Sequence, residues 1–399
     1  MTYTTNGPAP WPVPPDWSIG VRESLSWLTD VLRSNRTGYT QHRRLRLSPR
    51  RAFTFDVIAD AQSRRVAAAL LFDRGVKEWA LPIWPDVQRT DAAIASGATI
   101  VPCRTSGFDF AVGGQAMLWR GVNQFEVAII AAIAGDHLEL QAPLASSWAR
   151  GTRLYPVRAA RVVDGSEEQA WTDDAGKRSV SFQLTGPSDW PGVLPLVLYR
   201  GFPVLDHRSD EGTDPTSSVT RQIEFVDEGT SLVSAFDLAG RAFRTGSHRW
   251  LANGRGEQAV LRSLLYGLAG RSSPLWVPSG AADLKLAQPI AAASPTIVVE
   301  WAGYALFGRQ QQGRRDIRIE LKNGTAYHRR ITVSSQAGAN EVLTLDSALG
   351  ASVSLAQIRR ISFMSLSTLA SDDVEIEHMT DADGTALCNL TFAAVTDDV

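Results

Sequence analysis

The acidic residues that could carry hydrolytic chemistry fall in a few short polar segments. Asp206-His207 lies close to Asp210-Glu211, and Asp372-Asp373 forms another acidic pair. Two carboxylates can serve as general acid and base in glycoside hydrolysis, but spacing along the chain does not identify such a pair. Because these segments are polar and turn-like, we interpret their acids as solvated loop residues.

The segment SDDVEIEHMTDADG contains a fragment of a calcium-binding pattern, formed by Asp381, Asp383 and Gly384. A calcium loop closes with an acidic ligand, and Asn389 is a weak substitute for it. The sequence therefore does not predict a calcium site here.

Other motifs that bind metals or cofactors are missing from the sequence. Neither G-x-S-x-G, a P-loop, G-x-G-x-x-G after a strand, nor H-E-x-x-H is present. The two cysteines, Cys103 and Cys388, are too few for a zinc site and are expected to be small buried residues. The histidines are scattered without helical i, i+4 spacing: His42, His137, His207, His248, His328 and His378. We predict no enzyme, with no catalytic, cofactor-binding or metal-binding residue.

An arginine-rich run could bind a polyanion or an acidic neighbour. Its members are Arg33, Arg36, Arg43, Arg44, Arg46, Arg50 and Arg51. The formal net charge of the chain is -2, and only Tyr39 offers an aromatic ring within the run. A charged strand face is the favoured interpretation, and we expect no sequence-specific binding of nucleic acid. Arginine favours bidentate contacts with carboxylates, which could lie across a subunit boundary.

The length and composition describe a globular chain of 399 residues with 44% hydrophobic and 21% charged residues. We find no apolar run of the roughly 18 residues that a membrane span requires, so no membrane insertion is expected. The N-terminal segment has neither a basic start nor an apolar core, so it is not interpreted as a signal peptide. Synthesis in the cytoplasm is expected.

The elements that position these residues include a strand–helix–strand pattern. Arg44 to Leu47 and Phe53 to Val57 alternate with period two, as half-buried strands do. Ala67, Leu70 and Leu71 follow helical spacing. Gly75 is placed to end that helix, and the short apolar segment KEWALPIWP follows.

The same pattern recurs in the segment from Ser247 to Leu284. A strand with Trp250 and Leu251 precedes a helix with an apolar face, which ends at Gly270. The helical face and the matched segments are Leu261, Leu264, Leu265 and Leu268; Leu70-Leu71-Phe72 with Leu264-Leu265-Tyr266; and Trp79 to Pro82 with Leu275 to Pro278. The matched positions lie 194 to 196 residues apart, so the sequence predicts an internal duplication.

The tryptophans of the matched segments are interpreted as core residues. A ligand groove has no reason to recur beside a matched helix, whereas a structural strand does. Trp79 and Trp276 are therefore expected to pack across the sheet onto their helices. Trp84 has no aromatic counterpart, because Gly280 occupies the matching position.

Two further regions read as all-β. Short strands broken by Gly and Asp turns run from Gly97 to Leu144, which is typical of a small barrel or sandwich. The region after Pro295 is similar, and HLELQAPLA (137–145) corresponds to VLTLDSALG (342–350). The expected order is one α+β module, one all-β module, and then both again.

The N-terminal arm is rich in proline, with Pro8, Pro10, Pro12, Pro14 and Pro15. Such an arm should be extended and unable to enter a central strand. Packing of its tryptophans on the body is favoured over reaching a neighbouring subunit.

Two stretches of the sequence resemble tail proteins of long-tailed bacteriophages and prophages. They are WPVPPDWSIGVRESLSWLTDVLRS with RRLRLSPRRAFTFDV and WALPIWPD, and later RWLANGRGEQAVLRSLLYGLAGRSSPLWVPSG. The resemblance covers most of residues 8–290 and is to minor tail or distal-tail-like proteins of the tail tip and baseplate. It implies a structural protein at the distal end of the virion tail, in a ring joining the tail tube to the tip or fibres.

The resemblance also implies partners and a fold. The partners are the chain itself, in a trimeric or hexameric ring, and the neighbouring tube and tail-tip proteins. The expected fold class is α+β and mainly β, with duplicated β-sandwich-like modules each flanked by one helix, plus two small all-β modules. The expected parts are an extended arm (1–16), a first tube-type module (17–95), an inserted all-β module (96–160), a second tube-type module (161–286) and a C-terminal all-β module (287–399).

Two other functions remain open from the sequence. A carbohydrate-binding protein would require exposed aromatic faces at Trp119, Phe125 or Trp148, since sugars stack on such faces. An envelope-degrading hydrolase would require converging acids or a nucleophile in a cleft.

Overall fold

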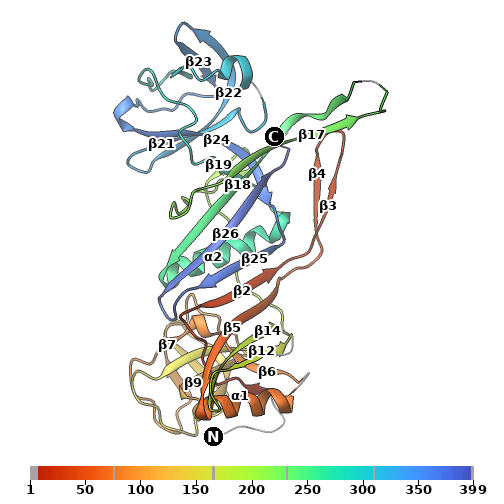
Figure 1. Ribbon diagram of the computed structural model, residues 1–399. Helices are drawn as coiled ribbons and strands as arrows, with labels where there is room; N and C mark the ends of the chain where they lie inside the picture. Colours follow the sequence, from red (N-terminus) through yellow and green to blue (C-terminus); the bar gives the residue numbers. More distant parts are fainter. Residues whose placement is uncertain (1–7, 75–76, 164–166, 231, 309–310, 397–399) are drawn as a thin grey trace.

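The computed structural model describes residues 8–74, 77–163, 167–230, 232–308 and 311–396. The fold is mainly β, with 48% strand and 11% helix, and contains a large antiparallel sheet and two longer helices. Figure 1 shows an elongated molecule in which the N-terminal half forms one end and the C-terminal half the other. We call these halves the first unit (β1 to β14) and the second unit (β15 to β26).

The first unit places one helix and a group of inserted strands between its long strands. Its elements are β1 (Ala9–Pro10), β2 (Val21–Ser26), β3 (Thr29–Arg33), β4 (Thr40–Arg44), β5 (Arg50–Asp60), α1 (Ala61–Arg74), β6 (Trp79–Pro82), η1 (Trp84–Asp86), β7 (Gln88–Arg89), β8 (Ile100–Pro102), β9 (Gln115–Gly121), β10 (Gln124–Ile133), β11 (His137–Leu140), β12 (Arg153–Val162), β13 (Glu168–Ala170) and β14 (Ala175–Leu184).

The second unit repeats this order. Its elements are β15 (Leu198–Tyr199), β16 (Phe202–Pro203), β17 (Ser217–Val226), β18 (Ser234–Asn253), α2 (Gly254–Leu268), η2 (Gly270–Ser272), β19 (Leu275–Pro278), β20 (Thr296–Glu300), η3 (Tyr304–Gly308), β21 (Asp316–Leu321), β22 (Ala326–Ala337), β23 (Asn340–Leu345), η4 (Leu355–Gln357), β24 (Ile358–Leu369), β25 (Asp373–His378) and β26 (Thr385–Ala394).

The two units use the same strand pairing. In the first unit the order is β5–β14–β12–β6, and in the second it is β18–β26–β24–β19, all antiparallel. The short strands β13 and β25 add to β14 and β26 in the same way. Individual hydrogen bonds also match between the units. Trp11 N–H donates to Ala80 O (3.1 Å), and Leu205 N–H donates to Trp276 O (2.8 Å), where Ala80 and Trp276 are equivalent positions. The strand order of the main sheet and these two hydrogen bonds therefore match between the two units.

The inserted strands are also equivalent. Strands β8–β11–β10–β9 follow the order of β20–β23–β22–β21, and β9 and β21 join the main sheets through β12 and β24. The register shifts at matching places, between Ile130 and Ala132 and between Ile331 and Val333. A bulge at the same point of both copies supports a common design.

Among the described residues, one strand pair joins the units into one continuous sheet. Strand β2 pairs with β5 of its own unit and with β25 of the second unit, both antiparallel. Val21, Glu23 and Leu25 alternate with exposed residues, so they share the buried face of β2. Beyond β2, the hairpin β3–β4 projects toward β17 (Figure 1).

The expected boundaries differ from the strand pairing. Strand β14 pairs with β5 and β12, so residues 175–184 belong to the first unit and not to a second module at 161–286. Strands β24, β25 and β26 pair with β19, β2 and β18, so much of 287–399 returns to the main sheet. Each all-β part is therefore an insertion between strands of one sheet. Local sequence patterns do not reveal such a return, because strand pairing is long-range.

Two local expectations are wrong. The segment Arg44 to Leu47 is not a strand beyond Arg44; Leu47 is 87% exposed, and Arg44 Nε donates to Arg46 O. The apolar residues Leu45 and Leu47 of this alternating segment are exposed, so they do not cover a core. Trp276 is fully buried but packs against Tyr199, on the side of β19 opposite α2. Its neighbour Leu275 faces the helix, since adjacent residues of a strand point to opposite faces.

The described part of the N-terminal arm lies on the first unit. Strand β1 adds parallel to β6, and Trp11 is fully buried with its ring edge-on to Trp79 and Phe182. The predicted helix-ending residue Gly75 lies outside the described residues. The proline-rich segment therefore forms an edge strand and contributes a core side chain.

Candidate functional site

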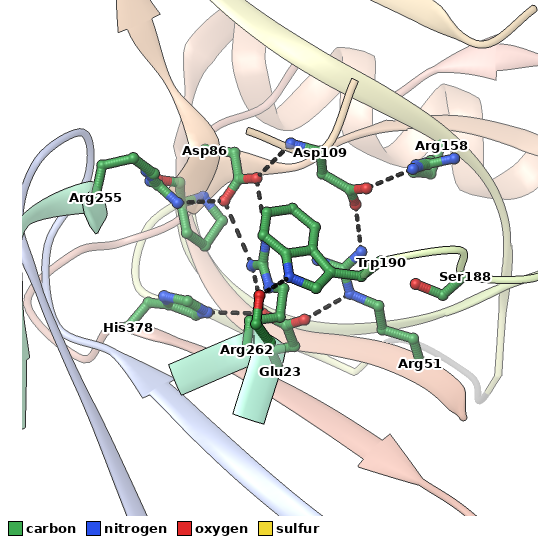
Figure 2. Close-up of polar contacts among 12 residues, drawn as sticks. Glu23, Arg51, Asp86, Asp109, Arg158, Ser188, Trp190, Arg255, Arg262 and His378 are labelled. Atoms are coloured by element: carbon green, nitrogen blue, oxygen red, sulfur yellow. Dashed lines mark hydrogen bonds and ion pairs between the residues drawn. The ribbon is translucent and has the colours of Figure 1, made fainter. Parts of the chain in front are cut away.

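A buried ionic cluster joins the two units where α2 meets the first unit (Figure 2). We call it the ionic junction, and its members come from both halves of the chain. They are Glu23, Arg51, Asp86, Asp109, Arg158, Arg255, Arg262 and His378.

Glu23 is the central anion of the junction. It lies on β2, is fully buried, and accepts from Arg51 Nε at 2.5 Å, Arg262 Nη2 at 3.1 Å and His378 Nε2 at 2.8 Å. These partners lie on β5, α2 and β25 respectively. One carboxylate thus connects three elements of two units.

Asp86 is the second anion and lies in η1, directly after the strand β6. It accepts from Arg255 Nη1 at 2.7 Å, Arg262 Nη1 at 3.3 Å and the backbone N–H of Asp109 at 3.0 Å. The Asp109 carboxylate in turn accepts from Arg51 and Arg158. Arg262 therefore bridges Glu23 and Asp86, and the anions and cations form one connected network.

Opposite charges keep the buried acids ionised. Burial alone would raise the pKa of Glu23, but the charges of Arg262 and Arg51 outweigh it and hold that pKa well below its ordinary value. Burial acts in the same direction on Asp86, and Arg255 with Arg262 lowers its pKa to about 2. An acid held ionised in this way cannot donate a proton near neutral pH, so these carboxylates do not fit a general-acid role.

His378 completes the junction as a neutral side chain. Burial lowers its pKa, against the opposing effect of its hydrogen bond to Glu23. Its Nε2 faces the carboxylate, and its Nδ1 is buried and has no hydrogen-bond partner among the residues that the structure describes. The neutral ring with its proton on Nε2 fits this arrangement.

A groove of about 420 Å³ in the second unit is lined by Asp206 and Glu211, two of the acids singled out in the sequence, and by Glu320. Asp206 pairs with Arg318, Glu211 accepts from Arg208 at 2.6 Å, and Glu320 accepts from Arg360 at 2.9 Å. The fold brings these three carboxylates to one groove, as a hydrolase requires, but each is paired with an arginine, and Asp206 and Glu211 are 62% and 56% exposed.

The basic run divides between surface and core. Arg51 alone enters the ionic junction, at 2% exposure. The others lie along the hairpin and the start of β5 with exposed or partly exposed side chains: Arg33, Arg36, Arg43, Arg44, Arg46 and Arg50. Arg51 binds two carboxylates, those of Glu23 and Asp109, and both lie in the first unit.

Asp372 differs from the solvated-loop interpretation. Its carboxylate accepts from the backbone N–H of Thr29 at 2.7 Å, the hydroxyl of Thr29 at 2.8 Å and the backbone N–H of Arg271 at 2.9 Å. Asp381 and Asp383 lie near Arg153 (3.8 Å) and Arg104 (3.0 Å). Within the described ranges, no group of three or more His, Cys, Asp or Glu side chains could hold a metal ion. Cys103 and Cys388 are buried free thiols, as expected.

The aromatic residues proposed for sugar binding are not open platforms. Trp148 is 3% exposed, and its indole N–H donates to Glu126. Trp119 is half-buried, with its N–H donated to Pro12 O, and Phe125 is half-buried against the first core. Trp84 is buried edge-on to Trp119 and Tyr155.

Sequence reasoning missed most of the ionic junction. Glu23 and His378 are far apart in the sequence, and Asp86 follows a run interpreted only for its aromatics. The available signal was a charge at an apolar position. Glu23 stands between Val21 and Leu25 in a period-two strand, and Arg262 follows Leu261 on the buried side of α2.

Comparison of the sequence with models of known protein families gives no match, and comparison with curated proteins gives no significant relative. Among the described residues, no helix has the length and apolar character needed to cross a membrane.

Proposed function

We propose that this chain is a structural component of a phage tail tip or baseplate, forming a ring that joins the tail tube to the distal tip or fibres. In this proposal the two units are duplicated β-sandwich-like modules, each with one flanking helix. The inserted all-β parts project from the ring and offer attachment points. The chain acts by assembly and not by catalysis.

The observation that carries the proposal is the side-by-side joining of two equivalent units in one sheet. Strand β2 of the first unit pairs with β25 of the second, and the two strands play different roles in their units. Such a contact is head-to-tail, and repetition of a head-to-tail contact builds rings or filaments. The buried charges fix the relative placement of the units, as a rigid ring requires.

The long hairpins add support. Strands β3–β4 and β17–β18 extend beyond the sheet, and the second hairpin exposes Phe225 (68%), Leu232 (92%) and Phe236 (53%). Exposed apolar side chains gathered on an extended element are typical of a protein–protein contact. Neighbouring proteins of the tail are the partners that the proposal assigns to it.

Immunogold electron microscopy of intact virions tests the proposal, with an antibody against this chain. We expect label confined to the end of the tail distal to the head. Virions without label, together with peptide spectra of opened particles that lack this chain, would refute it. Glycan-array binding and turnover of purified peptidoglycan or capsule by the free protein would then test the two alternatives.

A further inference from the structure

The ionic junction shows how the second unit packs against the first. Each unit also has a surface equivalent to the one its neighbour uses in that junction, and these two outer surfaces do not pack against each other within the described part of the chain. In the junction, β25 and α2 of the second unit meet β2 and η1 of the first. The corresponding outward elements are β13 and α1 on the first unit and β17 on the second. In the described part of the chain, β13 pairs with β14 alone and β17 with β18 alone.

The matching face of α1 is exposed where α2 is buried. Both helices present equivalent residues to their own cores, as Leu70 and Leu71 do in α1 and Leu264 and Leu265 in α2. This alignment places Phe72 at the position of Tyr266. Tyr266 is 8% exposed and packs edge-on against Trp27 of the first unit, whereas Phe72 is 96% exposed.

The charges of the junction are missing from α1. The same alignment puts Ala68, which is exposed, at the position of Arg262. Ala61 and Gln62 begin α1 where Arg255 stands near the beginning of α2. The outward face of α1 therefore lacks both arginines that α2 inserts into the first unit.

The receiving surface of the second unit has lost the matching acids. Glu23 pairs with Phe53 across β2–β5, and Ser217 pairs with Gly246 across β17–β18. Phe53 and Gly246 stand equally far before the ends of β5 and β18, so Ser217 corresponds to Glu23.

Asp86 and His378 have neutral counterparts as well. Asp86 lies four residues after Pro82, and Ala282 lies four residues after the matching Pro278. His378 pairs with Ala386 as Ala170 pairs with Gly176. The positions equivalent to the Arg262–Glu23 and Arg255–Asp86 pairs are thus uncharged on both surfaces. The charges that remain nearby, such as Arg64 with Glu168 on the first unit and Glu320 with Arg360 on the second, are paired within their own unit.

We propose that α1 and β13 of one copy dock onto the β17 edge and groove of the second unit of another copy, repeating the internal junction without its Arg262–Glu23 and Arg255–Asp86 pairs. The groove beside β17 is lined by Ser217, Val219, Arg244, Gly280, Ala281 and Asp283. It corresponds to the place in the first unit that receives α2. At these positions the two outer surfaces match each other and not the charged surfaces of the junction, so α1 and α2 do not exchange partners. This inference rests on the ring in the proposed function and names its subunit interface.

A charge-pair experiment on the purified full chain tests the interface, with sedimentation velocity as the readout. We expect the wild-type chain to self-associate with increasing concentration. Ala68→Arg alone and Ser217→Glu alone should each weaken association at least about tenfold, because each leaves a charge without a partner in the interface. The double variant, which recreates the Arg262–Glu23 pairing between copies, should restore association.

The controls separate docking from folding and from surface charge. Ala68 and Ser217 are exposed, so all three variants should keep the melting temperature of the wild type. Ala142→Arg, at an exposed position of the first inserted part, should leave association unchanged, and Phe72→Ser should weaken it. A wild-type chain that stays monomeric, or a double variant no better than its parents, would overturn the interface. Virion labelling is scored separately, so failure here is distinguishable from failure of the proposed function.

Discussion

The substitution Glu23→Gln tests the ionic junction most directly. It keeps the size of the side chain but removes the charge that faces Arg51, Arg262 and His378 at 2.5, 3.1 and 2.8 Å. Both arginines would remain buried with less compensation. Breaking one partner out of a buried ion pair costs about 3–5 kcal/mol, so we expect a loss of that size in the free energy of unfolding.

The matched control lies on the other face of the same strand pair. Arg22 and Glu375 are 3.7 Å apart and their side chains are 59% and 57% exposed. An exposed pair contributes about 0–1 kcal/mol, so Glu375→Gln should hardly change stability. The comparison separates burial from charge, since both variants remove one carboxylate from the β2–β25 contact.

The assay is urea-induced unfolding followed by circular dichroism and tryptophan fluorescence. Because Glu23 bridges the units, we also expect its loss to separate their unfolding into two transitions, one for each core. Combining Glu23→Gln with Arg262→Gln should cost less than the sum of the single changes, since the two groups interact directly. A loss below about 1 kcal/mol for Glu23→Gln, equal to that of the control, would refute the assigned role of the junction.

Three further predictions concern acid stability, assembly and the second core. Burial lowers the pKa of His248 from 6.5 to about 4. The free energy of unfolding that depends on this neutral side chain is therefore complete above pH 6.5 and is lost as the pH falls toward 4. His248→Asn should flatten that part of the urea midpoint–pH curve, and an unchanged slope would contradict the assignment. Mixing separate Thr216→Cys and Gln169→Cys variants under oxidation should give disulfide-linked dimers of the two. These positions are equivalent to Arg22 and Glu377, which lie opposite each other in the β2–β25 pair. Electrophoresis without such mixed dimers would count against this register. Leu265→Ala, at a fully buried site of α2, should cost about 2–5 kcal/mol in urea unfolding. The exposed Val260→Ala of the same helix should cost far less, and equal losses would refute the placement.

The two helices were readable from the sequence because local periodicity encodes them. The apolar spacing of Leu261, Leu264, Leu265 and Leu268 predicts α2 and its buried face, which the structure confirms. The return of β24 to β26 to the main sheet was not readable, because each pairs with strands distant in sequence. Segment patterns assign elements, whereas sheet membership depends on which edges meet.

The ionic junction was not readable for a different reason. Arg51 looks like one more residue of a basic run, and only its burial on β5 beside Phe53 distinguishes it. Asp86 follows Trp84 and Pro85, and this neighbouring tryptophan favours an interpretation of the segment as aromatic packing. A buried charge is identified by its partners, and the arginine partners of Asp86 and Glu23 include residues 169 and 239 positions away in the sequence.

The placement of charge in the internal junction alone has a physical reason. Buried ions such as Glu23 and Arg262 lose their hydration on entering an interface, and imperfect geometry leaves that loss uncompensated. Within one chain the units are tethered, so the contact forms at a high effective concentration and the network can settle during folding. Separate copies meet without a tether and also lose translational freedom, so a neutral surface of Ala68, Ser217 and Phe72 loses less hydration on docking. In the proposed assembly, charge thus fixes the arrangement inside each chain, and uncharged residues at the equivalent positions let the contact between chains form later.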